Sequence, residues 1–202
     1  MASDEPTPRA TRPSPPPVPP GTGTVGISLF LLSLFMLFSA AMVGYIFVRL
    51  AGTHSPARGS LHFPAILWIS TVLVVGVSFT MSRAVRALRH EHQPSFLKWM
   101  AASLALAIGF LLVQTPAMIV LLAEHQRLRA AGLFLYGLVF VLILLHALHV
   151  LGGMIALIRV TARGRKGIYD HEHYQPVRHT ALYWHFLDVI WILMFLTFLL
   201  TA

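Results

Sequence analysis

Tyr183-Trp184-His185-Phe186-Leu187-Asp188-Val189-Ile190-Trp191 opens an apolar run that continues almost to Ala202. The run is long enough to cross the hydrocarbon layer of a bilayer as a helix, which takes about 20 residues. His185 and Asp188 stand inside this run and share one helix face. Ionisable side chains at membrane depth are costly, so they indicate a function or a specific polar contact. We therefore expect the rest of the chain to supply helices that pack around this one.

The composition indicates a membrane protein with several spans. Of the 202 residues, 56% are hydrophobic and only 11% are charged, whereas a typical soluble domain has about 25% charged residues. The chain has no cysteine, which excludes disulfides, thiolate metal sites and cysteine nucleophiles. Its formal net charge is +8. The basic residues stand between apolar runs, which is typical of membrane topology and not of nucleic-acid binding.

Five apolar runs predict an all-α integral membrane protein with five transmembrane helices. They cover residues 25–48, 64–85, 97–122, 132–158 and 181–201. Only helices satisfy their own backbone hydrogen bonds in lipid, apart from closed barrels, and no run alternates as barrel strands do. Residues 1–23 are rich in proline and cannot bury apolar surface. We therefore predict a disordered cytoplasmic tail, 1–23, followed by a membrane domain, 24–202.

The basic residues predict the orientation of these helices, since Lys and Arg are enriched on the cytoplasmic side. One side would hold Arg9, Arg12, Arg83, Arg86, Arg89, Lys98, Arg159, Arg163, Arg165, Lys166 and Arg178. The other side would hold Arg49, Arg58, Arg127 and Arg129. The N-terminus is therefore expected in the cytoplasm and the C-terminus outside. The short loops leave no room for a catalytic domain outside the membrane.

The polar residues expected inside the membrane are few, and they are the candidates for a site. They are Gln114, His146, His149, Tyr183, Trp184, His185, Asp188 and Trp191. A haem or copper site would use the three histidines, although two on one helix and one on another is a weak signal. A proton path would use His and Asp, but the first three helices offer no buried carboxylate.

The favoured interpretation is structural: these side chains hydrogen-bond across the helices at 132–158 and 181–201 and fix their register, for example from His149 to Asp188 or from His185 to a neighbouring helix. Gln114 would need a polar partner at its own level. No residue is assigned as catalytic or metal-binding. Small residues at helical spacing also predict close helix contacts. These are Ser33, Ala40, Gly44, Ala101, Ala105, Gly109, Gly153 and Ala156.

Two clusters lie outside the apolar runs. The basic cluster suits anionic lipid headgroups, or it is only the topology signal; it consists of Arg159, Arg163, Arg165 and Lys166. A loop cluster of His171, His173 and His179 could bind zinc weakly beside Asp170 and Glu172. A solvated, pH-responsive surface is the favoured interpretation of this second cluster.

Two motifs resemble the signature of subunit III of the haem-copper respiratory oxidases. One is YWHFLDVIW at 183–191, and the other is HALHVLGG at 146–153, with its two histidines three residues apart. Weaker matches are Ser78-Phe79-Thr80 and the runs 111–114 and 26–38. Together they cover residues 26–200 in the family's order. The number of helices matches the family's short, five-helix form.

The resemblance implies a non-catalytic subunit of a terminal oxidase in a bacterial plasma membrane. Such a subunit binds no haem or copper itself, because these cofactors reside in the catalytic subunit I. It would stabilise subunit I, contact subunit II and other respiratory subunits, bind structural phospholipid, and support proton uptake during aerobic electron transport. By position, Arg163 matches a family arginine that contacts lipid phosphate.

The chain also lacks three carboxylates that are usual in the family, with Leu34, Ala117 and Arg178 in their places. The roles of those acids therefore cannot be carried over. Their loss keeps open a related assignment, the accessory subunit of nitric-oxide reductase. An alternative from a different class is a b-type haem protein that uses His146, His149 and His185.

Overall fold

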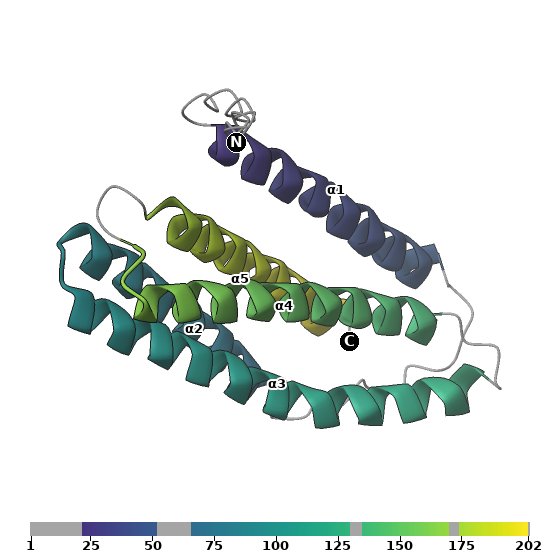
Figure 1. Ribbon diagram of the computed structural model, residues 1–202. Coiled ribbons are helices and arrows are strands. Elements are labelled where there is room, and N and C mark those ends of the chain that lie inside the picture. Colours follow the sequence, from purple (N-terminus) through teal and green to yellow (C-terminus); the bar gives the residue numbers. More distant parts are fainter. Residues whose placement is uncertain (1–21, 52–65, 130–134, 170–173, 202) are drawn as a thin grey trace, which may run out of the picture.

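The computed structural model describes residues 22–51, 66–129, 135–169 and 174–201, which form long helices (Figure 1). They are α1 (Thr22–Ala51), α2 (Ile66–Arg89), α3 (Gln93–Arg129), α4 (Leu135–Arg165) and α5 (Gln175–Thr201). Each contains a stretch long and apolar enough to cross a membrane. Within the described residues, the prediction of five helices long and apolar enough to span a membrane is confirmed. Residues 1–21, which hold most of the expected tail, lie outside the described residues.

The helices extend into polar sequence beyond the apolar runs, and their ends show why they stop. After α2, Glu91 adopts a positive φ of 57°, and the His92 amide donates to the carbonyl of Ala87 (3.0 Å). After α4, Gly167 has a φ of 68°, and its amide donates to the Gly164 carbonyl (3.0 Å). Both are left-handed caps that satisfy the last helical carbonyls. The tight turn after α2 makes α2 and α3 antiparallel neighbours.

The helices alternate in direction and form two groups on either side of α4 and α5 (Figure 1). The α2–α3 pair packs on one side, where α3 contacts α4 and α2 contacts α5. α1 lies on the other side and, among the described residues, contacts only α4 and α5. α5 is therefore the helix that joins α1, α2 and α4.

Two apolar clusters follow from this arrangement. The larger joins α2, α3, α4 and α5 and includes Met81, Phe96, Leu157 and Trp184. The smaller joins α1 to α4 and α5 and includes Phe38. Other apolar side chains on α1 stay exposed, such as Leu29, Phe35, Met36, Phe47 and Leu50. In a membrane such surfaces face lipid or another subunit.

The spacing of small residues was a poor predictor of which helix faces pack against other helices. Ala101 and Ala105 are exposed on α3, whose inward face carries larger residues such as Met100 and Phe110. Lipid is as apolar as a protein core, so residue size alone does not show which face is inward. The prediction is confirmed at Gly153, where an added Cβ would lie 3.0 Å from the Tyr183 ring.

On α1, Ser33 and Ala40 are likewise exposed, and the contact runs through Leu34, Phe38 and Tyr45, which are buried. The pattern also missed Gly164 of α4. An added Cβ there would lie 2.7 Å from the Phe96 ring. This second close approach joins α4 to the start of α3.

Candidate functional site

The two ionisable side chains within the apolar span of α5, His185 and Asp188, both face α2. Asp188 is buried and accepts a hydrogen bond from the Ser78 hydroxyl. The Nδ1 atom of His185 lies 2.6 Å from the same Ser78 oxygen, and its Nε2 atom lies 3.2 Å from the Ser82 oxygen. Ser78 therefore sits between the two ionisable groups of α5.

The donors and acceptors of this network can be ordered. A serine hydroxyl has one proton and accepts through its oxygen. Because Ser78 donates that proton to Asp188, the His185 ring must donate from Nδ1 to Ser78. In the neutral imidazole, Nε2 then accepts from the Ser82 hydroxyl. The bonds run in one direction, from Ser82 through His185 and Ser78 to Asp188.

The expected bond between His149 and Asp188 is absent, so that prediction is wrong. The His149 Nδ1 atom lies 2.7 Å from the carbonyl of Leu145 in its own helix. Instead, the Tyr183 hydroxyl of α5 donates to the backbone oxygen of His149 (2.9 Å). Tyr183 faces α4, whereas His185 and Asp188 lie on the face that meets α2. The polar contacts of α5 thus fix its register against both helices.

His146 and Trp191 meet where α4 and α5 pack together. His146 is 2% exposed, and its ring lies 5.3 Å from that of Trp191. The Trp191 indole N–H donates to the Thr71 hydroxyl of α2 (3.2 Å). In the part of the chain that the structure describes, both ring nitrogens of His146 and the indole nitrogen of the buried Trp184 have no hydrogen-bond partner.

His185 faces α2, whereas His146 and His149 both pack against Phe38 of α1. His185 contacts the serines of α2, His149 bonds within α4, and His146 packs beside Trp191 and Phe38. No group of three His, Asp or Glu side chains that could hold a metal ion occurs among the described residues. The structure thus does not bring together the histidine set considered for haem or copper.

Gln114 joins α3 to α2 instead of reaching the α5 network. It is buried, and its side-chain oxygen accepts from the Ser70 hydroxyl (3.1 Å). The same helix pair is joined again by Ser103, which donates to Thr80 (2.9 Å). The Ser70 hydroxyl thus supplies the polar partner that a glutamine at membrane depth needs.

Sequence reasoning missed the hydroxyl groups of α2. Thr71, Ser78 and Ser82 all contact α5, and they stand seven and four residues apart in the sequence. That spacing places them along one helix face. The repeat is visible in the sequence, but hydroxyl groups are common in membrane helices and so carry a weaker signal than ionisable groups.

The basic cluster lies at the C-terminal end of α4, with Arg159, Arg163, Arg165 and Lys166 all exposed. His179 was assigned to a loop, but it belongs to α5, and its Nε2 atom lies 3.4 Å from the Thr24 hydroxyl of α1. The other members of that loop cluster, His171 and His173, lie outside the described residues.

Two of the positions that lack the usual carboxylates can be placed. Leu34 is buried in α1, and Arg178 lines a pocket between α2 and α5. The side chain of Ala117 lies outside the description.

Comparison with known proteins gives the family. A sequence profile described as cytochrome c oxidase subunit III matches residues 21–201. A Synechocystis sp. protein named cytochrome c oxidase subunit 3 is 27% identical over 85% of this chain and 72% of its own length. One of the same name from Thermostichus vulcanus is 27% identical over 90% of this chain and 89% of its own length.

A Mycobacterium leprae protein named probable cytochrome c oxidase subunit 3 is 28% identical over 87% of this chain and 86% of its own length. The residues matched by the profile include all five helices. The chain therefore belongs to the cytochrome c oxidase subunit III family.

Proposed function

We propose that this chain is a non-catalytic subunit of a haem-copper terminal oxidase in a bacterial plasma membrane. The observation that carries the proposal is the family match over residues 21–201. The chain packs beside the catalytic subunit, which holds haem and copper, and contacts subunit II and further respiratory subunits. It stabilises the catalytic subunit during oxygen reduction and supports proton uptake.

The distribution of polar groups supports a structural role. His185, Asp188 and Tyr183 bond to neighbouring helices of the same bundle. The outer surface of α1 is apolar, with Leu29, Phe35 and other large side chains exposed. Such a surface can meet lipid or the apolar helices of another membrane subunit.

The basic cluster at the end of α4 supports phospholipid binding. Its guanidinium groups stand where a transmembrane span ends, and they are exposed. Arginine forms paired hydrogen bonds with phosphate oxygens. We propose that Arg163, with Arg159, Arg165 and Lys166, holds the phosphate groups of structural phospholipids.

Affinity purification tests the assignment to an oxidase. The tagged chain, extracted from membranes with a mild detergent, is expected to copurify with a catalytic subunit that carries haem and copper. The chain expressed alone with haem supplied is expected to show no Soret band. Stoichiometric haem on the isolated chain would contradict the proposal. Copurification with a nitric-oxide reductase core would establish the alternative assignment.

We also propose that the N-terminus is cytoplasmic and the C-terminus lies outside. The C-terminal ends of α2 and α4 carry basic last turns, with Arg86, Arg89, Arg163 and Arg165. These two ends lie at one end of the bundle (Figure 1), and basic residues mark the cytoplasmic side.

The absence of native cysteine makes this orientation directly testable. In intact cells, an impermeant maleimide is expected to label the variant Ala202→Cys but not Lys166→Cys. After the cells are opened, both should be labelled. The opposite pattern in intact cells would reverse the proposed orientation.

A further inference from the structure

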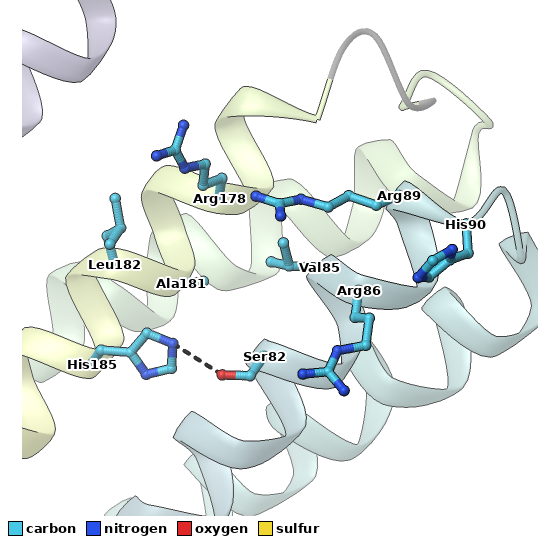
Figure 2. Close-up of a pocket in the computed structure, with 9 residues that line it drawn as sticks. All are labelled: Ser82, Val85, Arg86, Arg89, His90, Arg178, Ala181, Leu182 and His185. Atoms are coloured by element: carbon cyan, nitrogen blue, oxygen red, sulfur yellow. Dashed lines mark hydrogen bonds between the residues drawn. The ribbon is translucent and has the colours of Figure 1, made fainter.

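A pocket between the end of α2 and the start of α5 reaches the hydrogen-bond network of His185 and Asp188 (Figure 2). Its volume is about 400 Å³. On α2 the pocket extends from Arg89, in the last turn, inwards to Ser82, which is roughly two turns or 11 Å along the axis. On α5 it extends from Arg178 to His185. Its inner end is therefore the hydrogen bond between Ser82 and His185, drawn as a dashed line in Figure 2.

The charged side chains of this pocket keep it in contact with water. Arg86, Arg89 and Arg178 line it, together with His90. An arginine side chain is always charged, and taking such a charge out of water without a partner is costly. None of the side chains that line the pocket in the described part of the chain is acidic, so no carboxylate in its wall takes the place of that water. We therefore expect water in the pocket as far as Ser82.

Exposure falls along the network from Ser82 to Asp188. The Ser82 side chain is exposed, and those of His185 and Ser78 are partly buried. Asp188 is 5% exposed. Its Oδ2 atom accepts from the Ser78 hydroxyl, but among the described residues its Oδ1 atom has no hydrogen-bond partner. A buried carboxylate with a single donor is costly, and a bound proton removes its charge and most of that cost.

We propose that Asp188 is a proton-binding site that exchanges its proton with the water of this pocket. Hydronium gives a proton to the Ser82 oxygen and leaves as water, while the Ser82 proton moves to Nε2 of His185. The Nδ1 proton of His185 moves to the Ser78 oxygen, and the Ser78 proton moves to Oδ2 of Asp188. One proton has then entered, Asp188 is neutral, and His185 carries its proton on Nε2 instead of Nδ1. Release follows the same steps in reverse.

The route ends at Asp188. Within the described residues, the next hydrogen bond between α2 and α5 runs from the Trp191 indole to the Thr71 hydroxyl. An indole N–H only donates, so it cannot receive a proton and pass it on. The network therefore stores a proton and does not conduct it across the membrane. It belongs to this chain alone and does not rest on the assignment to an oxidase.

Other ionisable side chains lie around α5, but none of those described bonds to the network. On α4, His149 bonds to the backbone of its own helix, and His146 packs against Trp191. In the described part of the chain, α3 does not contact α5. The neighbouring elements and α5 itself also carry Tyr45 and Arg49 of α1, Glu91 after α2, and His179 and Tyr183 of α5. Exchange at Asp188 is thus expected to depend on His185 and the two serines.

Infrared spectroscopy of the full chain in nanodiscs tests the proposal. At acid pH, the difference between the natural chain and Asp188→Asn is expected to show the carbonyl band of one protonated carboxyl group. After rapid mixing with D₂O this band should shift, because a deuteron replaces the proton. His185→Leu removes the relay and should slow that shift roughly 100-fold, which is the lower end of what a positioned acid–base group contributes.

Matched variants separate the relay from general changes in packing. His149→Leu removes a histidine of α4 that bonds within its own helix, and it should leave the exchange rate unchanged. Ser82→Ala should slow the exchange, whereas Ser82→Thr keeps the hydroxyl and should not. Far-UV circular dichroism should show equal helix content in all of these variants.

Three results would each overturn the proposal. The first is a natural chain without a carboxyl band that Asp188→Asn removes. The second is exchange in His185→Leu or Ser82→Ala that is as fast as in the natural chain. The third is an equal loss of rate in His149→Leu, which would show that loosened packing, and not a broken relay, sets the rate.

Discussion

Ser78→Ala is expected to lower the free energy of unfolding by about 2–3 kcal/mol. One hydroxyl group serves both ionisable residues of α5, because it donates to Asp188 and lies 2.6 Å from His185 Nδ1. A hydrogen bond between membrane helices contributes about 0.6 kcal/mol on average and up to about 1.7 kcal/mol. A buried polar group left without a partner adds its own cost. The expected loss of unfolding free energy therefore exceeds the contribution of one ordinary hydrogen bond between helices.

Unfolding of the full chain in mixed micelles, followed by far-UV circular dichroism, measures this loss. Ser78→Thr retains the hydroxyl and should remain within about 1 kcal/mol of the natural chain. The double variant Ser78→Ala/Asp188→Leu should be more stable than Ser78→Ala alone, since it leaves no carboxyl without its donor. A double variant less stable than the single one would contradict the proposed role of Ser78.

Gly153→Leu is expected to cost about 3 kcal/mol and to weaken the contact between α4 and α5. An added Cβ at Gly153 would lie 3.0 Å from Tyr183, and 3.3 Å from both Leu187 and Trp184. Trp184 is 1% exposed, so its ring is enclosed by neighbouring side chains. The rest of a leucine side chain would push α5 away and break the bond from Tyr183 to the His149 backbone.

The neighbouring glycine supplies the control. Gly152 is exposed, and an added Cβ there would meet only the Tyr183 hydroxyl, at an ordinary 3.6 Å. Gly152→Leu should therefore be neutral or slightly stabilising, because leucine is a better helix former than glycine. Equal losses of stability in the two variants would show that helix propensity, and not the close approach of α5, decides the result.

The helices could be predicted from the sequence because the hydrocarbon layer requires about 20 apolar residues for each span. The helix faces that pack against other helices could not be predicted in the same way. In a soluble protein the polar side of a helix faces water, but in lipid both sides are apolar. Ala101 and Ala105 were therefore expected at a helix contact and are exposed.

The sequence predicted which ionisable side chains belong to the candidate site, but it did not predict the residues that bond to them. His185 and Asp188 stood out because charge is rare at membrane depth. Their partners on α2 are serines, which carry no comparable signal. A spacing of three residues shows that two side chains share a helix face, but it does not show which neighbouring helix that face meets. The expected bond from Asp188 to His149 was wrong for this reason, whereas Tyr183 of α5 does bond to the His149 backbone of α4.

The central place of α5 also has a consequence for how the protein is made. Chains leave the ribosome N-terminus first, and early segments begin to fold before later ones exist. α5 is the last of the five helices in chain order, yet it alone joins α1 to α2, which do not touch each other within the described residues. Until it enters the bilayer, Thr71, Ser78 and Ser82 lack their α5 partners. Insertion of the final span therefore completes a bundle in which α4 already contacts α1 and α3, and it adds the direct contacts with α2.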